Sequence, residues 1–144
     1  EEAIKRAESC IRLNRTHGKS HALLGSIAMT RGESARALEH FQIAGEQDPE
    51  DGSILAAMGR LHMPEDPARG RHLLREALIV ARADRSAHFD LGQYYERVNK
   101  LERAIAEYAL YVRFHDGKRA QWARRRIKRL NEKREKVMAR HAER

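Results

Sequence analysis

Apolar residues recur along this chain at intervals of three and four, with polar residues between them, and this period is typical of amphipathic α-helices. The pattern runs from one end of the chain to the other and predicts only helices. Within residues 1–14, one side of the expected helix holds Ala3, Ile4, Ala7, Cys10 and Ile11. Further helices are expected over about 19–30, 34–47, 53–62 and 118–141. Another is expected to begin at Pro67, with apolar residues as far as Ala81, and two more within 85–117.

Turn-forming residues separate these helices. Gly32 and Asn99 stand between expected helices, and both residue types accept the left-handed backbone conformation that ends a helix. Asp48-Pro49 ends another helix, because proline disfavours the helical conformation in the residue before it. Asp66-Pro67 favours a helix start, with an acceptor side chain at the cap and proline in the first turn. We therefore expect a series of helices joined by short turns.

Two short phrases recur in these helices with a nearly constant period. In the first phrase, Gly25, Gly59 and Gly92 each follow an apolar residue, and the steps between them are 34 and 33 residues. In the second, a small residue stands four places before a residue that is larger in three of the four copies, with steps of 34, 33 and 34 residues. The copies of the second phrase are Ala3 with Ala7, Ala37 with Phe41, Gly70 with Leu74 and Ala104 with Tyr108.

These phrases resemble the tetratricopeptide repeat, in which large-x2-Leu-Gly-x2-Tyr is followed by Ala-x3-Phe and then Pro at a period of 34 residues. The resemblance covers nearly the whole chain. It implies an all-α fold, a right-handed α-solenoid of antiparallel helix pairs. Residues 1–117 would be tetratricopeptide repeats and residues 118–144 a basic end helix. The repeats would be a half repeat over 1–17 and full repeats over 18–51, 52–84 and 85–117.

The net charge of +8 is unevenly distributed over the 144 residues. Residues 117–144 hold 12 Lys and Arg against 3 Asp and Glu, whereas residues 1–116 hold 17 against 18. The basic character therefore belongs to the end helix and not to the repeats. No apolar run approaches the roughly 20 residues of a membrane span, and no signal peptide is evident. Because the first residue is Glu, we expect the chain to be part of a longer protein.

The sequence offers no local pattern for catalysis or for a ligand of known chemistry. Gly18-Lys19-Ser20 resembles the end of a phosphate-binding loop, but the glycine required five places earlier is Leu13. The eight histidines form no cluster with metal-ligand spacing. We therefore predict a chain that is not an enzyme and that needs neither a cofactor nor a metal.

Cys10 is the single cysteine, so the chain can form no internal disulfide. It occupies a small-residue place between helices, which predicts a packed structural thiol. A lone thiol is compatible with a reducing compartment, and the cytoplasm is the favoured location.

The family resemblance also implies a binding surface. In tetratricopeptide arrays the first helix of each repeat lines a concave groove, which takes an extended peptide or a helix of a partner. The alternative is an ordinary solvated groove without a ligand. The family members that bind the carboxylate of chaperone tails are a poor match, because Asp90 stands at one of the matching places and would repel a carboxylate. The candidate groove residues here are Ser26, Met29, Arg60, Met63, Phe89, Gln93 and Arg97.

The basic end helix has three interpretations. It binds nucleic acid or an anionic membrane surface, it binds an acidic protein, or it is a solvated cap of the array. Its Lys and Arg residues surround the helix instead of forming one stripe, and Trp122 is its only aromatic residue, whereas single-strand binders interleave several. The candidate residues are Arg124, Arg125, Arg126, Lys128, Arg129, Lys133 and Arg134.

From these observations we expect a protein–protein interaction module, a scaffold or adaptor that binds a peptide or helix in the groove. One alternative is binding of nucleic acid or an anionic surface through the end helix, and another is a non-catalytic domain of a larger enzyme. A protein partner is favoured over nucleic acid. Self-association through the N-terminal half repeat is also expected, because the apolar face of residues 1–14 lacks its partner helix.

Overall fold

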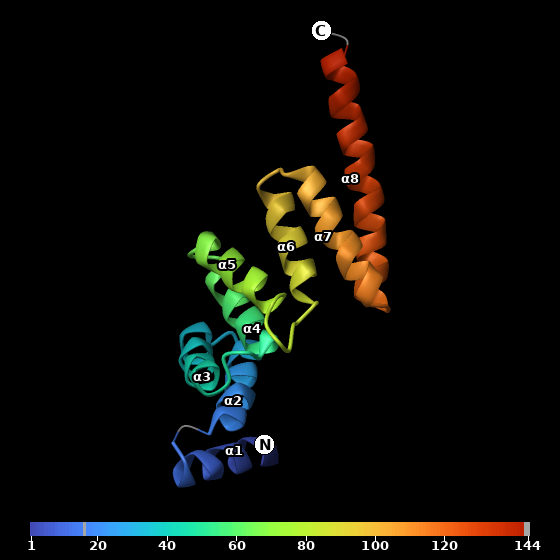
Figure 1. Ribbon diagram of the computed structural model, residues 1–144. Coiled ribbons are helices and arrows are strands. Elements are labelled where there is room, and N and C mark those ends of the chain that lie inside the picture. Colours follow the sequence, from blue (N-terminus) through green and yellow to red (C-terminus); the bar gives the residue numbers. More distant parts are fainter. Residues whose placement is uncertain (16, 143–144) are drawn as a thin grey trace. The chain divides into compact units, whose positions relative to one another are not determined.

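The computed structural model describes residues 1–15 and 17–142, and every regular element in this part is an α-helix (Figure 1). The chain divides into two compact units, Glu1–Asp84 and Arg85–Arg144. The helices of the first unit are α1 (Glu2–Leu13), α2 (Gly18–Thr30), α3 (Ser34–Gln47), α4 (Gly52–His62) and α5 (Pro67–Ala77). Those of the second are α6 (Ala87–Arg97), α7 (Leu101–Phe114) and α8 (Lys118–Ala142).

In the first unit, α2 pairs with α3 and α4 pairs with α5 (Figure 1). The helices approach closely because the repeated glycines lie at their contacts. A Cβ atom placed on Gly59 would lie only 3.0 Å from the carbonyl oxygen of Gly70 and 2.9 Å from Cγ of Leu74. The core between α2, α3 and α4 consists mainly of small residues around one aromatic ring: Ala28, Ala37, Phe41, Ala44, Ile54 and Ala57.

The segment after α5 differs from the expectation that apolar residues continue the helix as far as Ala81. The helix ends at Ala77, whose carbonyl oxygen accepts a hydrogen bond of 2.8 Å from the backbone N–H of Asp84. Arg82 in turn exchanges backbone hydrogen bonds with the turn between α3 and α4: its N–H donates to Glu50 and its carbonyl accepts from Gly52. These bonds replace the last helical turn, so the chain folds back on the start of α4.

Helix α1 is only partly covered. Ala7 is its one buried residue within the described part, and it packs against α2. The expectation of a packed thiol is wrong, because Cys10 is exposed. Together with Ala3 and Ala7, it borders an open hollow of about 290 Å³ between α1 and α2. The small-residue place was identified, but no described element covers it.

In the second unit, α6 and α7 form a pair and α8 packs beside α7 (Figure 1). Tyr108 on α7 is fully buried, and its ring approaches those of Phe89 and Trp122, with centroids 5.7 and 5.8 Å away. Asn99 makes the α6–α7 turn with a φ of 55°, in the left-handed region that its position predicted. Helix α8 buries Ala120, Ala123 and Leu130.

Candidate functional site

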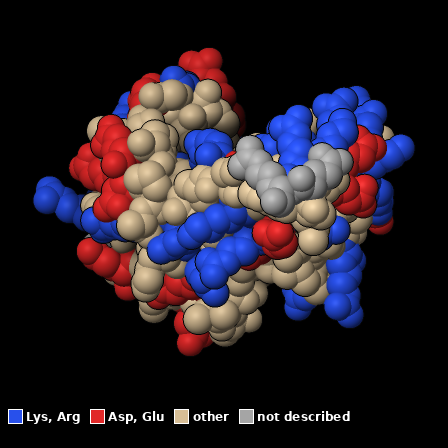
Figure 2. All heavy atoms as spheres, turned by 90° about the horizontal axis from the view of Figure 1, so that it is seen from above, with Lys and Arg blue, Asp and Glu red and all other residues tan. Residues whose placement is uncertain are grey.

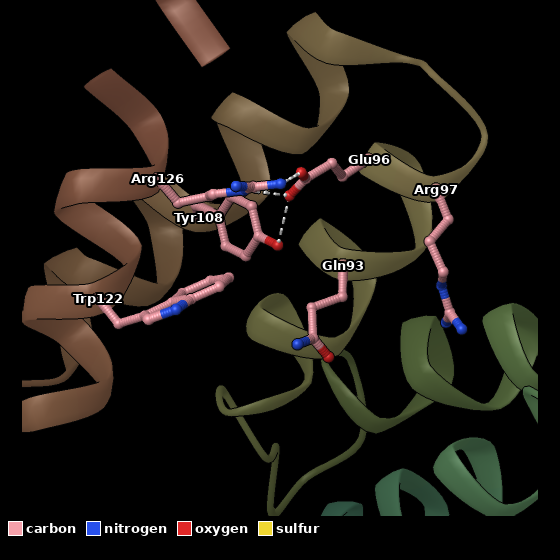
Figure 3. A pocket seen from close by; sticks show the side chains of 6 residues that line it. All are labelled: Gln93, Glu96, Arg97, Tyr108, Trp122 and Arg126. Carbon is pink, nitrogen blue, oxygen red and sulfur yellow. Dashed lines mark hydrogen bonds and ion pairs between the residues drawn. The ribbon is translucent and has the colours of Figure 1, made fainter. Parts of the chain in front are cut away.

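A pocket of about 390 Å³ opens within the second unit, between α6 and α8 (Figure 3). Gln93, Glu96 and Arg97 lie three and four residues apart on α6, so they share one side of that helix. Trp122 and Arg126 are four residues apart on α8 and form the opposite wall. The residues that line the pocket are Gln93, Glu96, Arg97, Tyr108, Trp122 and Arg126.

The position of these side chains follows from the packing of the three helices. Gly92, next to Gln93, lies against Tyr108: a Cβ atom there would come within 2.7 Å of its ring. Glu96, four residues after Gly92, lies on the same face of α6 and also reaches Tyr108. Tyr108 lies behind the two walls and forms the floor, and Trp122 leaves 39% of its surface exposed beside it. The pocket therefore has an aromatic floor and polar walls.

A hydrogen-bonded cluster connects the two walls (Figure 3). The Arg126 guanidinium donates to both carboxylate oxygens of Glu96, with a distance of 3.0 Å from Nε to Oε2. The Tyr108 hydroxyl donates to Oε2 of the same carboxylate at 3.2 Å. Bidentate arginine–carboxylate contacts of this kind are among the stronger polar interactions in proteins. The cluster ties α6, α7 and α8 together at the rim of the pocket.

The protonation states in this cluster follow from its geometry. The hydrogen bond from Arg126 is the main cause that holds the pKa of Glu96 below its ordinary value. The same bond raises the pKa of Arg126. Burial, together with the Glu96 charge, raises the pKa of the Tyr108 hydroxyl, so this group stays protonated. At neutral pH the pocket thus contains a compensated ion pair and a neutral tyrosine.

This arrangement is suited to binding. The residues that line the pocket include no Ser, Cys, His or Lys, and the Tyr108 hydroxyl donates a hydrogen bond to the Glu96 carboxylate, which Arg126 also contacts. Aromatic surfaces and a few oriented polar groups are typical of sites that hold a side chain or a small ligand.

The structure brings two of the predicted groove residues, Gln93 and Arg97, into this pocket. Two others, Phe89 and Met63, are each only 8% exposed, so their prediction as surface residues is wrong. Phe89 packs among the aromatic rings of its own unit, and the backbone of Met63 lies against Gly70. In the first unit, Ser26 is exposed, whereas Met29 and Arg60 are half-buried.

Sequence reasoning did not assign Tyr108, Trp122 and Arg126 to the groove. In the sequence, Tyr108 is the larger residue of a recurring pair, and Arg126 is a candidate residue of the basic end helix. One signal was available: Arg126 stands 34 residues after Gly92, where earlier copies of the phrase have glycine. A large charged residue at a place of close approach requires a partner, and Glu96 provides it.

The first unit contains a second hollow, of about 580 Å³, near the starts of α2 and α4. Lys19 and Ala22 on α2 line it, and Arg82 lines it from the segment after α5. Arg82 forms ion pairs with Asp48 and Asp51, the latter at 3.7 Å. These ion pairs join the α3–α4 turn to that segment, which gives them a structural role.

Some of the basic residues around α8 are aligned along the helix. Arg126, Arg129, Lys133, Lys136 and Arg140 follow one another at intervals of three, four, three and four residues, so they share one face of the helix. Trp122 precedes them by four residues on the same face. Lys and Arg side chains gather in the right-hand part of Figure 2. We call Arg126, Arg129, Lys133, Lys136 and Arg140 the basic line.

The other candidates on α8 lie elsewhere around the helix. Arg124 forms an ion pair with Asp116 at 3.4 Å, and Arg125 and Lys128 are exposed. Arg134 is half-buried, and its Nε has no hydrogen-bond partner among the described residues.

Residues 1–15 and 17–142 contain no group of three or more His, Cys, Asp and Glu side chains that could hold a metal ion. Among the helices of this same part, none is both long enough and apolar enough to cross a membrane.

Comparison with known proteins identifies the fold. No family model matches the chain, and no curated protein sequence does. Among solved structures, two crystal structures of MamA, a protein with tetratricopeptide repeats, match with a TM-score of 0.68 and 17% sequence identity over 94% of this chain. The match covers 89% and 77% of those two chains. The expected fold class is confirmed: the chain is all-α, with the helical arrangement of a tetratricopeptide-type solenoid.

Proposed function

We propose that this chain is a protein-interaction module built from a half repeat, three full tetratricopeptide repeats and an end helix. The helical likeness to MamA supports a module of this kind. In our proposal the pocket between α6 and α8 receives a side chain of a peptide or helix from a partner protein. The observation that carries the proposal is the exposed part of the Trp122 ring beside the Glu96–Arg126 ion pair, in a pocket backed by the buried Tyr108. Such pockets anchor the central residue of an interface.

The polar cluster supports the same role. The Glu96–Arg126 contact fixes the two walls before any ligand arrives, so little ordering is needed on binding. The positive charge of Arg126 also compensates the Glu96 carboxylate, which would otherwise repel acidic ligands. Gln93 adds an exposed amide that can donate to and accept from a peptide backbone.

A selection from a random peptide library against the intact chain tests this proposal. Peptides that bind through the pocket should lose at least about tenfold in affinity for Gln93→Phe, because the larger ring fills the entrance; a tenfold loss corresponds to about 1.4 kcal/mol. Gln121→Phe is the matched control, because Gln121 is an exposed glutamine on α8 outside the pocket. Equal binding of the selected peptides to both variants would refute the pocket as the binding site.

A further inference from the structure

The charges around the pocket specify the kind of partner, an inference that rests on the proposed function. Glu96 is compensated by Arg126. Of the charges that remain, Arg97 on the α6 wall is exposed and forms no ion pair with a described residue. On the α8 side the basic line continues away from the pocket with Arg129, Lys133, Lys136 and Arg140. The surface thus presents an excess of positive charge beside an aromatic pocket.

The basic line runs along the side of α8 that borders the pocket. Trp122 and Arg126, at its start, line the pocket directly. Further along, Lys133 Nζ donates a hydrogen bond of 3.2 Å to the side-chain oxygen of Asn99 in the α6–α7 turn. Arg129 lies between these points on the same face, is exposed, and has no acidic partner among the described residues. From Arg126 to Arg140 the basic line is about 21 Å long, at 1.5 Å per residue.

We propose that the pocket and the basic line together bind an acidic α-helix of a partner protein. One apolar side chain of that helix enters the pocket beside Trp122. Its carboxylates face the cations of α8. The cations recur on average every 3.5 residues along α8. Glutamates at the same three–four spacing on a second helix face these cations when the two helices lie side by side. The contacting cations are Arg129, Lys133, Lys136 and Arg140.

Two other anionic partners fit the surface less well. A bilayer surface binds a helix through a continuous free apolar face, but Ala120, Ala123 and Leu130 on α8 are already buried within the unit. The exposed large apolar side chains among the described residues of α8 are Trp122, Val137 and Met138, which form no continuous face. Single-stranded nucleic acid needs several aromatic platforms along the basic track, and Trp122 is the only aromatic residue of α8. An acidic helix needs only one anchor pocket and a line of cations, and both are present here.

The test uses the intact chain and a synthetic helical peptide that carries glutamates at three–four spacing and one leucine in line with them. An isomeric peptide, with the same residues but with its glutamates spread around the helix, serves as the reference. Trp122 is the only tryptophan of the chain, so its fluorescence reports binding at the pocket. We expect the patterned peptide to bind at least about tenfold more tightly than its isomer, a difference that corresponds to about 1.4 kcal/mol.

Charge reversal on α8 separates the basic line from general attraction. Arg129→Glu with Lys133→Glu should weaken binding of the patterned peptide at least about tenfold, and a peptide with lysines in place of glutamates should then bind this variant. Arg124→Glu with Lys128→Glu makes the same change in net charge on another side of α8, and should weaken binding less than about threefold. Equal losses in the two variants, or equal affinity for both peptides, would overturn the inference.

The remaining arms decide between partner classes. A single-stranded 12-nucleotide RNA and vesicles rich in phosphatidylserine are titrated under the same salt conditions. The RNA or the vesicles could bind more tightly than the acidic peptide, and the Arg129→Glu and Lys133→Glu variant could lose this binding. That result would assign the surface to that partner and contradict the inference. Neutral peptides could instead bind to the chain, lose affinity for Gln93→Phe and keep it for the charge-reversed variant of the basic line. That result would leave the proposed function intact and refute only the acidic partner.

Discussion

Single glycines decide how closely the helices of the first unit approach. Gly59→Ala should destabilise the chain by about 1–3 kcal/mol, because the new Cβ atom would press on backbone atoms of α5. The matched control is Gly45→Ala within α3, where a Cβ atom meets only Ile54 at an ordinary 3.7 Å. Removing that glycine should stabilise its helix by about 0.5–1 kcal/mol. Thermal unfolding measures both, and two changes of the same sign would contradict the packing account.

A histidine pair between α2 and α3 makes stability depend on pH. His21 Nε2 donates to the carbonyl oxygen of Arg15 at 2.8 Å, so the neutral ring accepts through Nδ1 from His40 Nδ1, 2.9 Å away. Burial is the main cause that lowers the pKa of His40, and the nearby His21 and Arg36 side chains lower it further. The unfolded chain therefore takes up this proton first as the pH falls.

The expected result is a loss of stability as the pH falls from about 6.5 towards the lower pKa of folded His40, with the full stability present above that range. His40→Gln should flatten this part of the profile, because no titrating group remains at the position. Melting temperatures at intervals between about pH 8 and pH 5 measure it. Parallel profiles for the wild type and the variant would show that His40 does not contribute.

At the scale of the helices, the sequence predicted most of the fold, because a three–four apolar period and turn residues are local signals. Helices α3 and α4 begin and end within one residue of the expected positions, and Asp66 caps α5 through a 3.0 Å bond from the N–H of Arg69. The end of α5 could not be predicted, because it depends on hydrogen bonds to a turn about 30 residues earlier.

The candidate site was less predictable than the helices. Gln93 and Arg97 follow from the repeat register, but the floor and the second wall do not. They require knowledge of which side of α8 packs on α7. In α6 the phrase residue Leu91 is buried, whereas its counterpart in α8, Arg125, is exposed. The end helix therefore departs from the repeat pattern at this place.

The exposed apolar face of helix α1 leads to a prediction about self-association or fraying. Its face with Ala3 and Cys10 is exposed, and Leu23 on α2 continues it at 40% exposure. Leaving such apolar surface in water costs about 25 cal/mol per Å². We expect either self-association through residues 1–14 that grows with concentration, or fraying of α1. Sedimentation and hydrogen exchange distinguish the two; a strict monomer with strong protection of residues 3–11 would contradict both.

For the molecule as a whole, charge and binding surface coincide in one unit. Residues 85–144 hold 17 Lys and Arg against 8 Asp and Glu, whereas residues 1–84 hold 12 against 13. The pocket and the basic line also belong to residues 85–144. The account therefore assigns partner binding to this unit.

The most direct test of this claim is chemical-shift mapping of the intact, nitrogen-15-labelled chain with a peptide selected as a binder. The account predicts that the largest changes, including that of the Trp122 indole N–H, cluster at the residues of the pocket between α6 and α8. It predicts that Gln93→Phe abolishes these changes while Gln121→Phe retains them. Changes centred on residues 1–84, or unaltered changes in the Gln93→Phe variant, would contradict the account.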